Sequence, residues 1–127
     1  MPALPKEIQN FHDLDAWKQG HELVLQIYQI TEDFPKTELF GIISQLRRAA
    51  SSITANIAEG FGRFHFNDKA RFYYQARGSA GEVLNFLILS KDLSFLNPEQ
   101  FKILETRVVQ TQKLINGLIR SIEAQKS

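Results

Sequence analysis

Residues 45–63 have the sequence QLRRAASSITANIAEGFGR, in which apolar and polar side chains both recur with helical spacing. The apolar row consists of Leu46, Ala50, Ile53 and Ile57. A second row, which we call the polar row, consists of Gln45, Arg48, Ser52, Asn56 and Glu59. Two adjacent stripes of this kind predict an amphipathic helix. We expect this helix to end at Gly60 and Gly62, because glycine readily adopts the left-handed backbone angles of a helix C-cap.

The polar row is unusual for a face that meets only solvent. Short Ser52 and Asn56 are poor helix formers because their side chains compete for backbone hydrogen bonds, and a solvent face usually carries long charged residues instead. We therefore expect the polar row to pack against something. It is either a surface for a ligand or RNA, or a buried hydrogen-bonded network with Arg77 and Glu82. We favour the network, because buried polar groups must find partners.

Three further amphipathic segments accompany this helix. We expect four helices, at about residues 14–33, 38–59, 68–93 and 98–124. Asp13 and Thr37 are the expected N-caps of the first two. The fourth helix has the clearest start, because Asn97, Pro98 and Gln100 supply an N-cap, a proline at the first position and a capping-box partner.

The apolar side chains predict which face each helix buries. The first helix carries two adjoining apolar rows, so more than one neighbour is needed to cover it. The buried side of the third helix is marked by Phe72, Ala76, Ala80, Val83, Leu87 and Leu93. The fourth carries a heptad seam of Phe101, Leu104, Val108, Thr111, Ile115, Leu118 and Ile122.

Two glycines, Gly78 and Gly81, lie in the interior of the third helix, where together they cost about 2 kcal/mol relative to alanine. Small residues let another backbone come close, so we expect another helix to approach there. The alternative is a break in the helix at Gly78.

Short connections between long helices favour antiparallel neighbours. The sequence therefore predicts an all-α fold, an antiparallel up-down-up-down four-helix bundle that forms a single domain over residues 1–127. A rival arrangement is a three-helix array that completes its core only when the chain self-associates. Self-association is expected in either case, and the candidate interface residues are Trp17, Phe61, Phe64 and Phe66.

Composition excludes several classes of function. The chain has no cysteine, so disulfides and thiolate metal sites are excluded. No apolar run approaches the roughly 20 residues that span a bilayer, and Met1–Glu7 lacks the apolar segment of a leader peptide. We therefore expect a cytoplasmic protein without a membrane partner.

Catalysis has little support in the sequence. The three histidines lack metal-ligand spacing, no glutamate has a histidine three residues later, and no nucleophile elbow surrounds a serine. We expect no enzyme activity, no cofactor and no metal.

Basic residues gather in the middle of the chain, although the net charge is only +1. Residues 45–80 hold six basic side chains against two acidic ones. From these we choose as candidate RNA contacts Arg47, Arg63, Lys69 and Arg71. The alternative is that the arginines pair with acids inside the bundle or between subunits. The neighbouring Phe61, Phe64 and Phe66 could stack on bases or anchor a subunit interface, and we favour the interface.

Three segments resemble one family. Residues 46–63, 11–17 and 76–83 resemble the 23S ribosomal RNA intervening-sequence proteins, which are small bacterial four-helix bundle proteins. The resemblance implies a bundle that assembles into a ring, typically a homopentamer. It also implies a relationship to the accessory protein of diversity-generating retroelements, which binds a reverse transcriptase and RNA. One departure is Leu84, where the family often has a second acidic residue after the position of Glu82.

These observations together predict a non-enzymatic, oligomeric helical bundle. Its expected partners are further copies of itself and RNA or an RNA-handling protein, which would bind through the basic surface. The alternative is a protein-binding scaffold with no nucleic-acid role.

Overall fold

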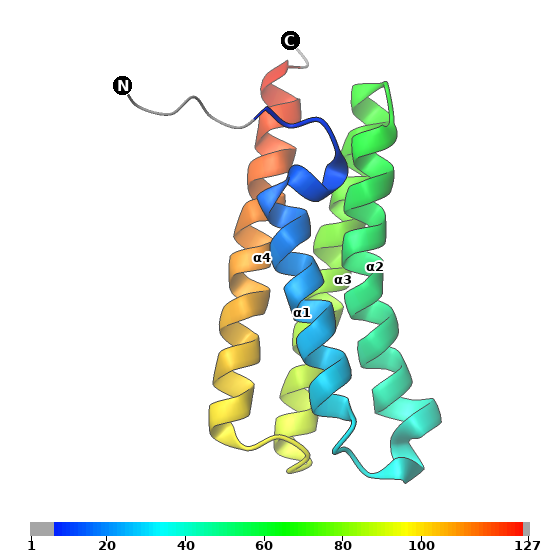
Figure 1. The fold of residues 1–127 in the computed structure, drawn as a ribbon, viewed down its shortest axis with the longest axis vertical. Helices are drawn as coiled ribbons and strands as arrows, with labels where there is room; N and C mark the ends of the chain where they lie inside the picture. Colours follow the sequence, from blue (N-terminus) through cyan, green and yellow to red (C-terminus); the bar gives the residue numbers. More distant parts are fainter. Residues whose placement is uncertain (1–6, 126–127) are drawn as a thin grey trace.

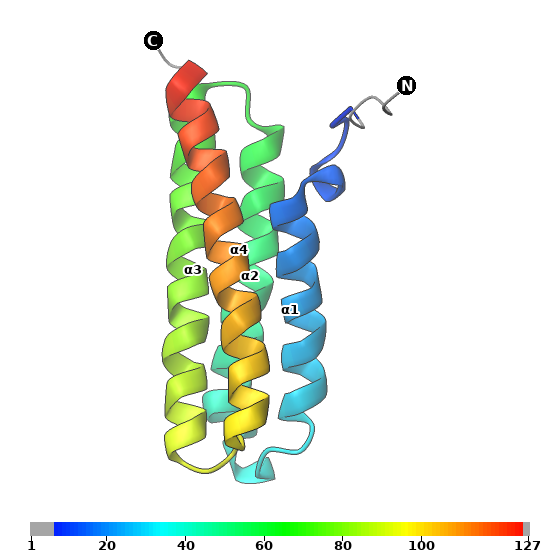
Figure 2. The same ribbon diagram turned by 90° about the vertical axis from the view of Figure 1, so that its left-hand side faces the viewer.

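The computed structural model describes residues 7–125, which form a four-helix bundle (Figure 1). The helices are α1 (Asp15–Thr31), α2 (Ser44–Gly62), α3 (Phe66–Asp92) and α4 (Pro98–Gln125). Successive helices run in opposite directions, and Figure 2 shows α1 and α3 on either side of α4 with α2 behind it. The described residues contain no β-strand, so the predicted all-α bundle is confirmed. Of the segment considered for a leader peptide, Met1–Glu7, all but Glu7 lies outside the described residues.

The core is built from one row of side chains on each helix. In α4 the buried residues are Phe101, Leu104, Val108, Thr111, Ile115, Ile119 and Ile122, so the predicted seam is confirmed except that Ile119 replaces Leu118. In α3 the buried residues are Tyr73, Ala76, Ala80, Val83, Leu87 and Ser90. Phe72 and Leu93 were wrongly placed in this row, because only the alternation of three- and four-residue steps keeps one face toward the core.

The connection between α1 and α2 differs from the prediction. We expected a helix from residue 38, but a 3-10 turn, η2 (Lys36–Glu38), and a π-helical turn, η3 (Leu39–Ile43), precede α2. Gly41 lies outside the helical region, with φ −111° and ψ −115°. This bend delays the start of α2 to Ser44 and leaves the Phe40 side chain 93% exposed.

The C-terminal end of α2 is also different, because Gly60 lies inside the helix and is buried. No glycine in residues 7–125 has a positive φ, so the predicted left-handed C-cap is wrong. A Cβ atom at Gly60 would lie only 2.6 Å from Cε1 of Tyr73 on α3. The glycine therefore permits α2 and α3 to approach each other closely.

The interior glycines of α3 do not have this role within the chain. A Cβ atom at Gly78 or Gly81 would meet no other atom within 4 Å, and α3 continues unbroken through both positions. Within residues 7–125, no other helix covers α3 at these two glycines.

The helix ends confirm one predicted cap and correct another. The backbone N–H of Gln100 donates to the Asn97 side chain at 2.7 Å, and the backbone N–H of Asn97 donates to the Gln100 side chain at 3.0 Å, which is the predicted capping box. Asp13 does not cap α1. Its carboxylate accepts backbone N–H bonds from Gln9 and Asn10, because the 3-10 turn η1 (Phe11–Asp13) places Leu14 before α1.

Candidate nucleic-acid interface

The short turn between α2 and α3 brings together three of the four predicted RNA contacts. Only three residues separate the two helices, so Arg63, Lys69 and Arg71 lie at the same end of the bundle. This turn and the end of α4 lie at the top of Figure 1. We call the described turn and the adjoining start of α3, residues 61–72, the basic turn.

Two arginines of the basic turn share one aromatic ring. The guanidinium carbon of Arg63 lies 4.8 Å from the centroid of the Phe72 ring, and that of Arg71 lies 4.7 Å from the same centroid. Contacts of this kind hold a cation over a ring without using its hydrogen-bond donors. Both arginine residues are exposed. Arg63 also forms an ion pair with Glu59 at 3.3 Å.

Lys69 has a different position, because its ammonium group binds to backbone carbonyls in the last turn of α2. Its Nζ donates to the backbone oxygens of Phe61 at 2.7 Å and Gly60 at 3.2 Å. A cation at the last carbonyls of a helix complements the helix dipole. Burial lowers the pKa of the Lys69 ammonium below its usual value. Lys69 therefore contributes charge to the basic turn while two of its donors are already used.

The aromatic residues of the basic turn differ in exposure. Phe64 is 89% exposed and Phe66 is 38% exposed, whereas Phe61 is half-buried under the Lys69 ammonium. The His65 ring meets the Phe64 ring edge-on, with centroids 5.3 Å apart. Trp17, the fourth candidate interface residue, lies elsewhere, in the first turns of α1.

Trp17 belongs to an aromatic cluster of its own. Its ring stacks on the His21 ring at 4.6 Å with an interplanar angle of 10°, and the Phe11 ring packs against it at 5.5 Å. These contacts place His21 beside an aromatic partner on a half-buried face.

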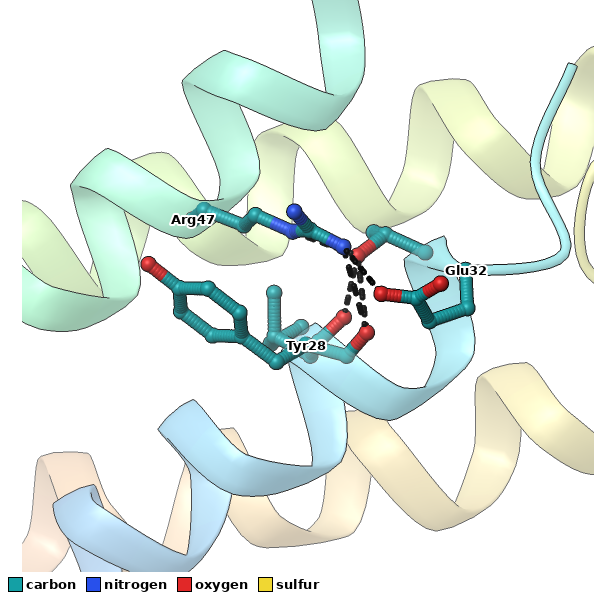
Figure 3. Close-up of polar contacts among 5 residues, drawn as sticks. Tyr28, Glu32 and Arg47 are labelled. Carbon is teal, nitrogen blue, oxygen red and sulfur yellow. Dashed lines mark hydrogen bonds and ion pairs between the residues drawn. The ribbon is translucent and has the colours of Figure 1, made fainter. Parts of the chain in front are cut away.

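Arg47, the remaining predicted RNA contact, lies near the opposite end of α2, about 24 Å from Arg63 along the helix axis. Its Nε donates to the Thr31 hydroxyl at 2.9 Å, and its Nη2 contacts the Tyr28 carbonyl and the Glu32 carboxylate, both at 3.4 Å (Figure 3). Its guanidinium also lies over the Tyr28 ring at 4.6 Å. Arg47 thus fastens the last turn of α1 to α2.

The polar row lies along the outer side of α2. The hydroxyls of Ser52 and Ser79 are 2.9 Å apart and link α2 to α3, and the Asn56 amide donates to the Ser52 carbonyl and hydroxyl. Gln45, Arg48 and Glu59 are exposed.

The expected partners of the polar row on α3 lie differently. Arg77 donates to Asn116 of α4 at 3.1 Å and covers the Tyr74 ring. Glu82 is exposed. Within residues 7–125, neither of them bonds to the polar row. One hydroxyl pair is therefore the only part of the expected network present between α2 and α3, and the structural role of the row stays a prediction.

Sequence reasoning missed the partners that give these arginines their positions. Tyr28, Thr31 and Glu32 were not connected to Arg47, and Phe72 was assigned to the core rather than to the arginines. The one available signal was Thr31, a polar residue in step with buried Ile27.

Within residues 7–125, no three histidine, aspartate or glutamate side chains are grouped so that they could hold a metal ion. In the same part of the chain, no helix is both long enough and apolar enough to cross a membrane.

The fold and this interface define a small helical bundle with a basic, aromatic turn at one end. The chain belongs to the family of 23S rRNA-intervening sequence proteins, which its sequence matches over residues 12–117. It is similar in structure to a protein with unknown function from the S23 ribosomal protein family of Bacteroides thetaiotaomicron, with a TM-score of 0.77 and 21% identity over 83% of this chain and 95% of that chain. A comparison with curated proteins gave no significant match.

Proposed function

We propose that this protein is a non-enzymatic RNA-binding protein that works as a homo-oligomer and contacts RNA or a ribonucleoprotein through the basic turn. The observation that carries the proposal is that Arg63 and Arg71 lie over the Phe72 ring and Lys69 over the Phe61 ring, at the end of the bundle where the turn exposes Phe64. The family name, which refers to 23S rRNA, supports an RNA-related role. A cytoplasmic location follows from such a role.

Arg63 and Arg71 are the main phosphate contacts in this proposal. Their guanidinium groups are held by Phe72, and their hydrogen-bond donors remain largely available. Arginine suits phosphate because its planar fork matches the phosphate oxygens. Repetition of a modest basic patch in an oligomer raises the overall affinity without a high charge on each chain.

The test is an RNA titration of the purified protein at about 50 and 200 mM salt. The double variant Arg63→Gln/Arg71→Gln should bind more weakly. The slope of log binding constant against log salt concentration should fall in magnitude by about 1.4 for each subunit whose two arginines neutralise phosphates of a single strand. The matched control is Lys36→Gln/Lys113→Gln, which removes the same charge from exposed positions away from the basic turn. Absence of binding at low salt, or an equal loss in the control, would leave a protein-binding scaffold as the better interpretation.

Arg47 separates structural from binding arginines in the same experiment. Its donors already bond to Thr31, Tyr28 and Glu32. We therefore expect Arg47→Met to lower the free energy of unfolding by about 1–2 kcal/mol and to leave the RNA affinity of the folded protein unchanged. If Arg47→Met instead lowers the RNA affinity and leaves the free energy of unfolding unchanged, Arg47 is an RNA contact.

The homo-oligomer is supported by the uncovered face of α3. Gly78 and Gly81 lie open on this face. The same helix leaves Ile88 42% and Leu89 43% exposed, and Leu93, which directly follows it, is 50% exposed. A second copy that packs here would use the close approach that glycine allows. The family resemblance implies a ring of five subunits.

Light scattering of the purified protein tests the assembly. We expect an oligomer for the native sequence and a smaller mass for Gly78→Ala/Gly81→Ala, which should keep its helix content because alanine favours a helix. A monomeric native protein would refute self-association. An oligomer that survives both substitutions would place the interface elsewhere, with Trp17, Phe61, Phe64 and Phe66 as the predicted alternative.

A further inference from the structure

The most exposed ring of the basic turn has surroundings that suit one form of RNA. Phe64 is 89% exposed and follows Arg63 directly, and among residues 7–125 its one aromatic contact is with the His65 ring, edge to face. A face of the Phe64 ring is therefore open to solvent. An exposed aromatic ring has apolar area that a bound partner can remove from water.

We propose that Phe64 is a stacking platform for an unpaired nucleotide, so that the basic turn selects single-stranded RNA over a paired duplex. This inference rests on the proposed RNA-binding function. Bases inside a duplex are covered on both faces by their neighbours, whereas an unpaired base offers a free face to an aromatic side chain. A phenylalanine ring has no hydrogen-bonding group, so the selection concerns strandedness and not base identity.

The charges around Phe64 favour a nucleic acid over a second protein chain. Arg63 and Arg71 are exposed and held over one ring, and Lys69 adds a third positive charge nearby. In the same stretch, residues 61–72, Asp68 is the one acidic side chain. An apolar protein interface depletes its centre of such charge, but a strand that stacks a base on Phe64 brings its phosphates to these cations.

A second exposed phenylalanine provides the matched control. Phe40 is 93% exposed at the opposite end of α2, beside Leu39 and Ile43. Phe40→Ala removes the same group from η3, the turn before α2, which lies outside the basic turn. Two further variants separate stacking from simple apolar contact, because Phe64→Trp keeps a larger stacking surface and Phe64→Leu keeps apolar area without a ring face.

The experiment uses the full-length protein, a fluorescent oligouridylate of about 20 nucleotides, longer than a typical single-strand site, and a blunt RNA duplex of the same length. We expect tighter binding of the oligouridylate. Phe64→Ala and Phe64→Leu should each weaken it about 5- to 100-fold. Phe64→Trp should retain it, and Phe40→Ala should leave it unchanged.

Each outcome separates this inference from the proposed function. If both RNAs bind equally and Phe64→Ala has no effect while Arg63→Gln/Arg71→Gln weakens binding, stacking is refuted and RNA binding stands. If neither RNA binds at low salt, the proposed function fails and the inference with it. If Phe64→Ala reduces the oligomer mass seen by light scattering, Phe64 is a subunit anchor and the inference is overturned. An equal loss in Phe40→Ala would show nonspecific apolar binding and would also overturn it.

Discussion

Gly60→Ala is the substitution whose effect the structure specifies most directly. The new Cβ atom would lie 2.6 and 2.8 Å from Cε1 and Cδ1 of Tyr73, and 3.1 Å from Cβ of Phe72. The Tyr73 ring is buried in the core and cannot move away as a flexible side chain would. Overpacking of this kind costs about 1–3 kcal/mol. Alanine recovers less than about 1 kcal/mol from helix propensity near the end of α2. We therefore expect a net destabilisation of about 1–2 kcal/mol.

Urea denaturation followed by far-UV circular dichroism measures this change, with the fluorescence of Trp17, the chain's single tryptophan, as a second probe. The protomer concentration must be held constant, because self-association makes stability depend on it. Gly62→Ala is the control, since a Cβ atom there meets nothing within 4 Å. If Gly60→Ala is as stable as the native protein, the close packing of α2 against Tyr73 does not limit this position and the reasoning is refuted.

Three other substitutions have defined outcomes. Ser94→Gly should raise the free energy of unfolding by about 0.5–1 kcal/mol. The reason is that Ser94 has φ 65° in the turn after α3, where the Phe95 N–H bonds to the Ser90 carbonyl. A lower free energy of unfolding, measured by urea denaturation, would contradict this. Asn97→Ala should lower the free energy of unfolding by about 1 kcal/mol through loss of the capping box. An unchanged unfolding midpoint would show that the capping box does not stabilise the fold. Burial raises the pKa of the Tyr73 hydroxyl to about 12, above the value near 10 of an unfolded tyrosine, so the folded state holds its proton while the unfolded state releases it. Stability should therefore fall by roughly 1–2 kcal/mol more in the native protein than in Tyr73→Phe as pH rises from about 10 to about 12, and identical pH profiles would refute the assignment.

The sequence predicted the structure best in the helix where capping residues and hydrophobic spacing indicate the same boundaries and the same buried face. In α4 the three- and four-residue spacing and the Asn97–Gln100 capping box specify both the start and the buried face, and the structure confirms both. In α1, by contrast, the buried row includes Ala16 and Gly20. A search for large apolar residues overlooks such positions, because their burial comes from the closeness of neighbouring helices and not from their own hydrophobicity.

The glycines show why the remaining features could not be predicted. Gly41, Gly60 and Gly78 are chemically identical in the sequence, but one lies at a bend, one allows contact with Tyr73 and one faces open space. Glycine permits all three situations. Only the positions of the other helices decide among them.

The four basic residues that the sequence predicted as RNA contacts differ in the interactions that each would lose on binding a phosphate. Arg47 would lose its bonds to Thr31 and the Tyr28 carbonyl, which would leave a partly buried helix end without its partner. Lys69 would uncover the last carbonyls of α2. Arg63 would give up one exposed ion pair with Glu59, an interaction worth about 1 kcal/mol or less in water.

Arg71 would give up less than any of them, because its contact with the Phe72 ring leaves its donors available and need not be broken. The order of expected contribution to phosphate binding is therefore Arg71 and Arg63 first, then Lys69, with Arg47 last. Single glutamine substitutions, compared by their effects on RNA affinity and on the free energy of unfolding, should show these two quantities changing in opposite order along the series. A series in which Arg47 dominates the affinity would mean that the intramolecular contacts of an arginine do not govern its availability for RNA.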